Sequence, residues 1–229
     1  MEIIRYAELR AEPWRNKGGV TRELASHPKA ASAQDGAWDW RVSIAEVSKA
    51  GAFSTFPGMD RVLTVIDGEL LLLTVDGAEH PLEKYRPFRF SGEADTASAL
   101  PTGDIRDLNV ITRNGAFKGY TSIIELSKKR AHPVFEGQLG ILLQGQATVS
   151  PGTASDAGAD GSATVEPEAA GNAGAGDSEG DSPEAAPDSG EPETLGRYDA
   201  VVGSDSRTPE IVGRGFLAVV SIDRVTSQP

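Results

Sequence analysis

The sequence predicts an all-β protein made of short antiparallel strands, and three observations support that prediction. Residues 38–45 alternate between apolar and mostly polar side chains, which is the period of a strand. The dipeptides Asp67-Gly68 and Asp76-Gly77 separate apolar runs, and Asp-Gly favours tight turns because glycine accepts a positive φ and aspartate tolerates it. No segment shows a convincing long helical period, so we expect no long helix.

Each expected strand is an apolar or alternating run bounded by turn residues. In the centre of the chain the two Asp-Gly turns give the order strand, turn, strand, turn. The expected strands cover residues 38–45, 61–66, 69–75, 107–113 and 215–222. Strands this short are typical of jelly-roll barrels.

An internal repeat divides this pattern into two similar halves. Residues 65–70 (VIDGEL) resemble residues 142–147 (LLQGQA), and residues 82–90 (LEKYRPFRF) resemble residues 195–202 (LGRYDAVV). Each copy gives a strand, a glycine turn, a strand, a variable tip and a Leu-x-(Lys/Arg)-Tyr motif that leads into another strand. This order is typical of a cupin half-barrel, so two copies predict a double cupin (bicupin), with two jelly-roll barrels in one chain.

We expect two domains: an N-terminal cupin barrel with its motif segment over residues 1–104, and a second cupin barrel over residues 105–229. The second is interrupted by an acidic insert, residues 151–194, which has eleven acidic residues, no Lys or Arg, and no aromatic residue. Such a segment cannot bury enough apolar surface to offset its ordering entropy, so we expect it to be disordered. It falls at the hairpin tip of the second copy, where insertions are tolerated. It is either a tolerated loop expansion or an interaction tail.

The composition excludes several classes of function. The 229 residues include no cysteine, which excludes disulfides, zinc–thiolate sites and thiol nucleophiles. The net charge is -12, but outside the insert 23 acidic residues face 22 basic ones, so no basic surface for nucleic acid is expected. The N-terminus lacks the apolar run of a signal peptide, and the longest apolar run, residues 70–73, is too short to span a bilayer. We therefore expect a cytoplasmic protein that binds neither nucleic acid nor membrane.

Four motifs in the first half resemble the HutD/Ves family and occur in the family order. They are PWRNKGGVTRE at 13–23, WRVSIAEV at 40–47, GAFSTFPGMDR at 51–61 and DLNVITR at 107–113. The resemblance implies a bicupin fold and a regulatory association with bacterial histidine utilisation. It also implies a small acid of that pathway as ligand, such as formylglutamate or urocanate, and it brings no established enzymatic activity. The acidic insert is a departure from the family pattern.

The histidine pattern argues against a metal centre. Metallo-cupins use a His-x-His pair, a nearby Glu and a later His. The only histidines here are His27, His80 and His132, and none forms such a pair. When the hairpin glycines are aligned, the glutamate ligand position falls on Arg61. The second barrel offers His132 and Glu136, too few for a site, so we expect neither a metal nor a cofactor.

Arg61 is instead the first candidate for binding a ligand. A planar guanidinium holds a carboxylate through two parallel hydrogen bonds, and the low dielectric inside a barrel strengthens this pairing. The structural alternative is a salt bridge, for instance with Asp60 or Glu46.

Further candidates lie on two expected strands. Side chains alternate along a strand, so Asn109 and Arg113 share one face with Asp107 and Ile111. The alternative for Arg113 is solvation at the strand end, whereas Asn109 inside a strand needs a hydrogen-bond partner. Arg41 and Ser43 lie on the face opposite Trp40, Val42 and Ile44, and the pattern leaves open whether they point into the barrel or to solvent.

Two turn segments complete the candidate ligand-binding set. Asn16, with Gly18 and Gly19, is either a backbone nest that receives an anion or a plain turn. Phe53 and Phe56 flank a Pro-Gly turn and are either apolar walls of a binding site or core residues.

The residues predict a protein that binds a small carboxylate metabolite in a metal-free cupin barrel, and the resemblance to the HutD/Ves family implies that it acts as a regulator. No nucleophile with a base and an orienting group is visible, nor a phosphate-binding loop, so no catalytic residue is assigned. The alternative is a metal-independent cupin isomerase or lyase that acts on a small organic acid. A third hypothesis is a scaffold whose acidic insert recruits a partner. The expected partners are a small anionic metabolite and, as an open alternative, a second copy of the chain.

Overall fold

The computed structural model describes residues 1–28, 38–152 and 190–226. Apart from the one-turn 3-10 helix η1 (Tyr6–Glu8), every regular element in these residues is a strand, and all strand pairs are antiparallel. The prediction of an all-β protein is therefore confirmed. Most of the acidic insert lies outside the described residues. The prediction that it is disordered concerns those residues and stays a prediction.

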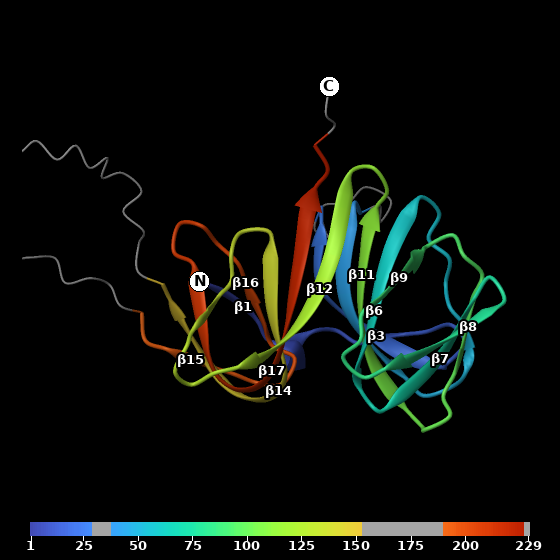
Figure 1. The fold of residues 1–229 in the computed structure, drawn as a ribbon, viewed down its shortest axis with the longest axis horizontal. Coiled ribbons are helices and arrows are strands. Elements are labelled where there is room, and N and C mark those ends of the chain that lie inside the picture. The colour runs from blue at the N-terminus through green and yellow to red at the C-terminus, as the bar shows by residue number, and fades with distance from the viewer. Residues whose placement is uncertain (29–37, 153–189, 227–229) are drawn as a thin grey trace, which may run out of the picture.

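The strands form three sheets (Figure 1). The first half of the chain supplies a six-stranded sheet of β2 (Glu12–Pro13), β3 (Gly19–His27), β4 (Trp40–Val47), β11 (Ile105–Arg113), β6 (Met59–Asp67) and β9 (Phe88–Ser91). It also supplies a four-stranded sheet of β5 (Gly51–Ala52), β10 (Thr96–Ala99), β7 (Leu70–Val75) and β8 (Ala78–Glu83). A seven-stranded sheet contains β1 (Glu2–Ile4), β16 (Ala200–Val202), β14 (Gln138–Pro151), β17 (Pro209–Arg224), β12 (Phe117–Leu126), β13 (His132–Pro133) and β15 (Glu193–Leu195).

The expected strands are present, but one Asp-Gly turn differs from the prediction. Asp76-Gly77 closes the hairpin of β7 and β8. Asp67-Gly68 does not close a hairpin, because β6 pairs with β11 and β9 whereas β7 pairs with β8 and β10. This turn carries the chain from the six-stranded to the four-stranded sheet. Gly68 has a φ of 81°, and a Cβ there would lie 2.8 Å from the carbonyl oxygen of Asp104, so the close approach requires glycine.

The internal repeat is visible in the backbone. Tyr85 and Tyr198, the tyrosines of the two Leu-x-(Lys/Arg)-Tyr motifs, have φ angles of 67° and 70°, a conformation that is uncommon outside glycine. The backbone N–H of Tyr85 donates to the carbonyl of Val65 (2.8 Å), and that of Tyr198 donates to the carbonyl of Leu142 (2.6 Å). Val65 and Leu142 begin the two copies of the glycine-turn motif. Each repeat therefore has a tyrosine with a positive φ, and each tyrosine forms the equivalent backbone hydrogen bond.

The two faces of the six-stranded sheet meet different neighbours. On one face, Val42, Ile44 and Leu108 join a core cluster with Ile141 and Ala218 of the seven-stranded sheet. On the other face, Ala45, Leu63 and Val65 belong to a second cluster that includes Leu71 and Leu73 of the four-stranded sheet. The six- and four-stranded sheets, which lie at the right of Figure 1, therefore share one core cluster between them.

The interior of the first half is polar in part, and that of the seven-stranded sheet is not. The sheet curls around a third cluster made of aliphatic side chains from β12, β14, β15, β16 and β17. Among the described residues that follow Thr112 in the sequence, Asp199 is the only buried polar or charged residue. Because buried polar groups are costly unless they are partnered, their concentration in the first half marks its interior as a candidate site.

Strand pairing does not follow the expected domain boundary between residues 104 and 105. Strand β11, which starts at Ile105, pairs with β4 and β6 of the first half, and the N-terminal strand β1 pairs with β16 of the second. The ends of the acidic insert do meet at paired strands, since Val149 of β14 is opposite Glu193 of β15. Glu193 and Thr194, expected to belong to the insert, are part of strand β15.

Candidate ligand-binding cavity

A cavity of about 530 Å³ opens on the polar interior of the first half. It contains seven of the eight residues predicted to bind a ligand: Arg61, Asn109, Arg41, Ser43, Asn16, Phe53 and Phe56. The other lining residues are Glu12, Pro13, Trp14, Arg15, Thr21, Ala45, Ala52, Ser54, Asp107 and Ile111. Residues from distant parts of the sequence thus line one cavity.

Strand register places the polar side chains of the cavity in rows. On β11, Ile111 is opposite Arg41 of β4 and Arg61 of β6, and Asn109 is opposite Ser43. Residues directly opposite one another across antiparallel strands point to the same face of the sheet. Arg41 and Ser43 therefore face the cavity, because the alternating Val42 and Ile44 occupy the opposite, core-facing side of β4.

Arg61 is the central cation of the cavity and is only 4% exposed. Its guanidinium carbon lies 5.6, 5.2 and 5.0 Å from the ring centroids of Phe53, Phe56 and Phe90. Nη1 donates to the carbonyl of Ser54 (3.2 Å) and Nη2 donates to Oδ1 of Asn109 (2.8 Å), but Nε is buried without a partner. Burial lowers the pKa of Arg61 to about 10, against the opposing charge of Asp107, so the group remains charged at neutral pH.

The salt bridge considered as an alternative role for Arg61 is not formed. Glu46 pairs instead with Arg22 and with Arg106, whose Nη2 is 3.3 Å from Oε2. No ion pair joins Arg61 to Asp60 among the described residues. Arg61 is thus held by aromatic rings and neutral oxygens, not by a carboxylate in direct contact.

Asp107 is a site residue that the sequence analysis did not select. It is 0% exposed and lines the cavity. Its Oδ1 accepts a hydrogen bond from Nδ2 of Asn109, whereas its Oδ2 has no partner. Burial raises the pKa of Asp107 to about 7, although the charge of Arg61 opposes the rise. The strand alternation that placed Asp107 on the same face as Asn109 was the signal that could have identified it.

Arg41 is a second cation at the cavity. Its Nε lies 3.2 Å from Oε2 of Glu23, an ion pair whose geometry is not that of a hydrogen bond. Its guanidinium carbon is 5.9 Å from the ring centroid of Trp38. The partly exposed Glu23 neutralises Arg41 at the cavity rim, in contrast to Arg61 in the interior.

Asn16 and Arg113 are placed by contacts with the chain itself. Oδ1 of Asn16 accepts the backbone N–H of Gly18 (2.9 Å), so this N–H is used within the chain, and the anion nest at this turn stays a prediction. Arg113 does not belong to the cavity lining. Its Nε is 2.6 Å from Oδ1 of Asp39, and its Nη2 donates to the carbonyl of Trp38 (3.2 Å), so Arg113 forms a salt bridge at the strand end, and its contact with a ligand stays a prediction.

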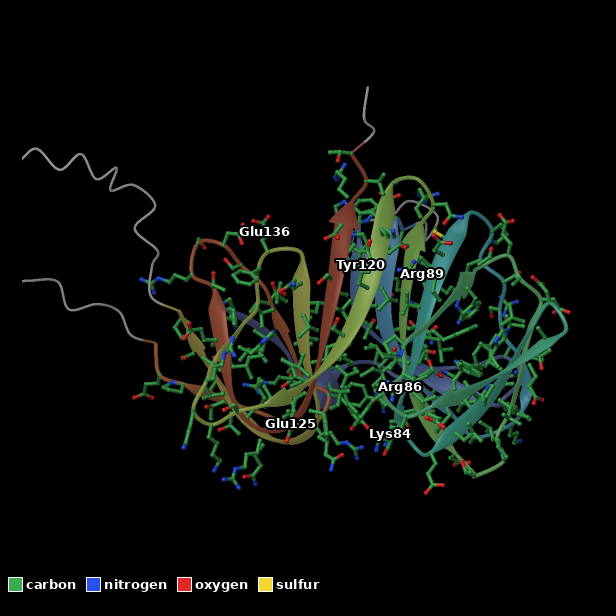
Figure 2. All side chains as sticks on the ribbon, viewed as in Figure 1. Lys84, Arg86, Arg89, Tyr120, Glu125 and Glu136 are labelled. Atoms are coloured by element: carbon green, nitrogen blue, oxygen red, sulfur yellow. The ribbon has the colours of Figure 1, made fainter. Side chains whose placement is uncertain are left out.

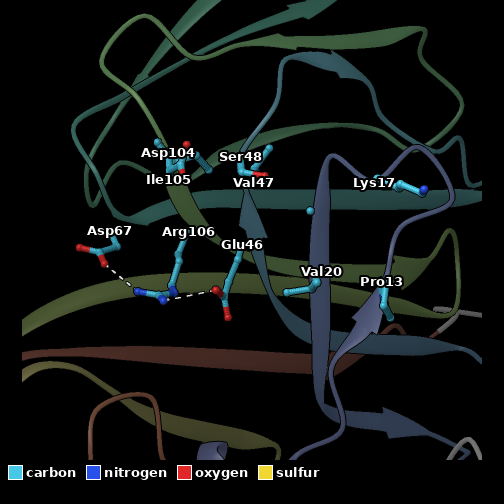
Figure 3. A pocket seen from close by; sticks show the side chains of 11 residues that line it. Pro13, Lys17, Val20, Glu46, Val47, Ser48, Asp67, Asp104, Ile105 and Arg106 are labelled. Atoms are coloured by element: carbon cyan, nitrogen blue, oxygen red, sulfur yellow. Dashed lines mark hydrogen bonds and ion pairs between the residues drawn. The ribbon is translucent and has the colours of Figure 1, made fainter.

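A second hollow, of about 460 Å³, is lined by residues of the first half, among them Glu46, Asp67 and Arg106 (Figure 3). Its charged groups compensate one another. Arg106 bridges Oδ2 of Asp67 (3.0 Å) and Oε2 of Glu46 (3.3 Å), as the dashed lines in Figure 3 show. Asp67 also pairs with Arg197 (2.9 Å). These charged groups of the hollow are thus already paired within the chain.

Within the described ranges, no group of three or more His, Cys, Asp or Glu side chains is arranged to hold a metal ion. His27 stacks on Trp40, with ring centroids 6.0 Å apart, and His80 contacts Phe88 at 4.6 Å. Burial lowers the pKa of His132, with a further contribution from the charge of Arg130. The metal-free state of the protein stays a prediction. No described helix is long and apolar enough to cross a membrane.

The fold is shared with solved all-β proteins. A conserved protein of unknown function from Pseudomonas aeruginosa superposes with a TM-score of 0.69 at 21% identity, covering 98% of this chain and 99% of that one. HutD from Pseudomonas fluorescens superposes with a TM-score of 0.67 at 23% identity, with the same coverage. A further neighbour is Ylba from E. coli, of the DUF861 family, with a TM-score of 0.64. At these identities the likeness concerns the fold.

The family model of HutD matches residues 6–178, and the chain belongs to the HutD family. An uncharacterized protein in the hutC 3' region of Pseudomonas putida is 38% identical over 112 residues, which are 48% of this chain and 57% of that protein. Protein Ves of Citrobacter koseri is 35% identical over 127 residues, 53% of this chain and 64% of that protein. The matches thus span less than two thirds of these relatives, and the family resemblance seen in the motifs is confirmed.

Proposed function

We propose that this protein binds a small carboxylate metabolite, such as formylglutamate or urocanate, in the cavity around Arg61, without a metal, and that binding serves a regulatory role in histidine utilisation. The pathway is supported by the family and by the name of the Pseudomonas putida relative, which lies in the hutC 3' region. We place this activity in the cytoplasm, in keeping with a chain that contains no cysteine.

The observation that carries the proposal is the state of the Arg61 side chain. A buried guanidinium is costly unless it is paired and hydrogen-bonded. Arg61 lines the cavity, has no carboxylate in direct contact, and leaves Nε without a partner. Nη1 and Nη2 each carry a second N–H, so a bound carboxylate would complete the hydrogen bonding of the group. The aromatic rings around it would exclude water from the ion pair.

We further propose the bicupin arrangement, in which each copy of the repeat forms one barrel. The matching φ angles of Tyr85 and Tyr198 and their matching hydrogen bonds support a duplicated unit. In this arrangement the first barrel holds the ligand and the second is filled by aliphatic side chains. Strand pairing favours a boundary after β11, between Arg113 and Phe117, and the exchange of β1 into the second half.

Arg61→Ala tests the proposal. The loss of a charge-assisted hydrogen-bond pair, worth about 1.5–3 kcal/mol, predicts a dissociation constant about 10 to 150 times larger. Arg61→Lys should restore only part of the affinity, because an ammonium group lacks the two-pronged geometry. Calorimetric titration with formylglutamate and urocanate measures both effects, and a thermal melt of each variant establishes that it is folded.

The matched control is Arg89→Ala. Arg89 lies on β9 beside Phe90, is exposed and does not line the cavity. Its guanidinium carbon is 5.5 Å from the ring centroid of Tyr120 of β12, and both residues are labelled in Figure 2. Its replacement should leave the affinity unchanged. If the wild-type protein and a folded Arg61→Ala variant bind each acid with equal affinity, the carboxylate is held elsewhere.

One observation favours a second candidate function, a metal-independent isomerase or lyase. The pKa of Asp107, raised by burial to about 7, suits a general acid or base at neutral pH. A binder returns its ligand unchanged, whereas an enzyme does not. Proton NMR spectra of each acid after prolonged incubation with the protein distinguish the two, and Asp107→Asn should abolish any turnover found.

A further inference from the structure

We propose that the cavity selects acids that carry an N–H or O–H donor close to the carboxylate, and that Oδ2 of Asp107 is the residue atom that accepts this donor. The inference rests on the proposed function, since it takes Arg61 as the group that binds the carboxylate. It names a ligand class, small hydroxy acids and N-acylamino acids, and it names Asp107 as the residue that determines specificity.

The first observation is a pair of buried atoms without partners, on two side chains that both form hydrogen bonds with Asn109. Nε of Arg61 is a donor without an acceptor, and Oδ2 of Asp107 is an acceptor without a donor. Both side chains line the same cavity, and neither is more than 4% exposed. A buried polar atom left unpaired costs free energy, and a ligand that satisfies both atoms removes both costs.

The second observation is that Asn109 itself shows which ligand pattern fits. Its Oδ1 accepts from Nη2 of Arg61 (2.8 Å), and its Nδ2 donates to Oδ1 of Asp107. One carboxamide thus offers an acceptor to the arginine and a donor to the aspartate. A ligand lying beside this carboxamide meets the same two groups in the same order. A carboxylate with an adjacent hydroxyl or amide N–H has that order, whereas a plain carboxylate offers nothing to Asp107.

Asp107 and Arg61 interact through their charges but do not touch. No direct ion pair joins the two side chains in the described structure, and their link runs through Asn109. The other charged groups at the cavity are Arg41 of β4, which pairs with Glu23 of β3, and Glu12 and Arg15 of the N-terminal segment. The segment 52–56 of the opposite wall contributes no charged residue to the lining.

Ionisation of Asp107 sets the conditions for the test. Burial raises its pKa to about 7, with the charge of Arg61 opposing the rise, so the carboxylate is mostly ionised at pH 8 and mostly protonated at pH 6. An ionised Asp107 accepts a donor more strongly than a protonated one does. The preference for donor-bearing acids should therefore be larger at pH 8 than at pH 6.

Two pairs of probes isolate the donor. Lactate and propionate differ by one hydroxyl group, and N-acetylglycine and O-acetylglycolate differ by an N–H in place of an ester oxygen. At pH 8, titration followed by calorimetry or NMR should show at least one donor-bearing acid binding about tenfold or more tightly than its partner, as expected for a hydrogen bond to a charged group. Using two pairs samples two positions of the donor relative to the carboxylate.

Asp107→Asn is the decisive variant. Its Oδ1 can still accept from Asn109, while its Nδ2 places a donor where the Oδ2 acceptor stood. The affinity ratio of each pair should fall to about one or below, and Arg89→Ala should keep the wild-type ratio. Ratios near one in the wild-type protein, or a preference that persists in a folded Asp107→Asn variant, would overturn the inference and leave carboxylate binding standing. If none of the four acids binds while formylglutamate or urocanate does, the inference fails and carboxylate binding stands. If formylglutamate and urocanate also fail to bind, the proposed function fails as well.

Discussion

The carboxyl group of Asp107 couples the stability of the protein to pH. Burial raises its pKa to about 7 in the folded chain, against the charge of Arg61, whereas an unfolded aspartate has a pKa of about 3.9. Between these values the folded chain holds a proton that the unfolded chain has lost. The free energy of unfolding must then fall as pH rises from about 4 to about 7, because the native state binds more protons.

Asp107→Asn should remove this part of the pH dependence. The variant keeps an acceptor for Asn109 and cannot ionise, so its stability relative to the wild type should increase from pH 5 to pH 8 by a few kcal/mol, since one pKa unit corresponds to about 1.4 kcal/mol. Urea unfolding of both proteins at a series of pH values measures the difference, in which contributions of other groups cancel. Parallel pH profiles would mean that Asp107 titrates normally.

At the scale of the elements, the acidic insert joins two strands that pair at their ends. Val149 of β14 is opposite Glu193 of β15, and Arg5 contacts both Glu193 (2.7 Å) and Asp199 (2.9 Å). The strand ends are therefore held independently of the insert. Lengthening a surface loop costs only about 0.6 kcal/mol per doubling of its length, so a short connection should serve the fold as well as a long one.

Replacing residues 153–189 by a short Gly/Asn turn should leave the thermal midpoint within a few degrees of the wild-type value. The replacement keeps Pro151 and Glu193, which end the paired strands. Differential scanning calorimetry gives the midpoint, and titration with the acid bound by the full chain gives the affinity, which should also be unchanged. A drop of many degrees would show that the insert packs on the folded part.

At the scale of the whole molecule, Asp67 connects the two halves. It pairs with Lys84 (3.9 Å) and Arg106 (3.0 Å) from the first half and with Arg197 (2.9 Å) from the second. Lys84 and Arg197 occupy the same position in the two Leu-x-(Lys/Arg)-Tyr motifs, so both repeats reach the same turn. Burial alone would raise the pKa of Asp67, but the hydrogen bond and charge of Arg197 outweigh it, and the pKa lies below its usual range.

Asp67→Asn should destabilise the protein at neutral pH, and the loss should shrink as pH falls. A carboxyl whose pKa is depressed by folding contributes stability above its unfolded pKa of about 3.9 and loses that contribution as pH falls through the folded pKa. Because the site is partly exposed, the effect at pH 7 should be modest and smaller at high salt. Thermal melts at pH 7 and pH 3, at low and high salt, compare variant and wild type. A deficit that does not depend on pH would exclude the ionic role.

The sequence by itself determined the strands, the repeat and most of the members of the site. Alternation predicts which residues share a face of one strand, because side-chain direction along a strand is a local property. This is why Arg41, Ser43 and Asn109 could be named before their neighbours were known. The motif order identified the family, and the alignment at the glycine turns placed Arg61 at a ligand position.

The tertiary structure decided which face of each strand became the interior of the first half, and thus what each charge meets. Asp67-Gly68 has the local chemistry of a hairpin, yet its strands enter different sheets, because pairing partners are chosen by long-range packing. Arg113 pairs with Asp39 at a strand end, although alternation places it on the face of Asn109. Asp107 looks like an ordinary strand aspartate in the sequence. Only the burial of its carboxyl group next to Asn109 and Arg61 raises its pKa and leaves Oδ2 unpaired, because desolvation depends on the surrounding strands.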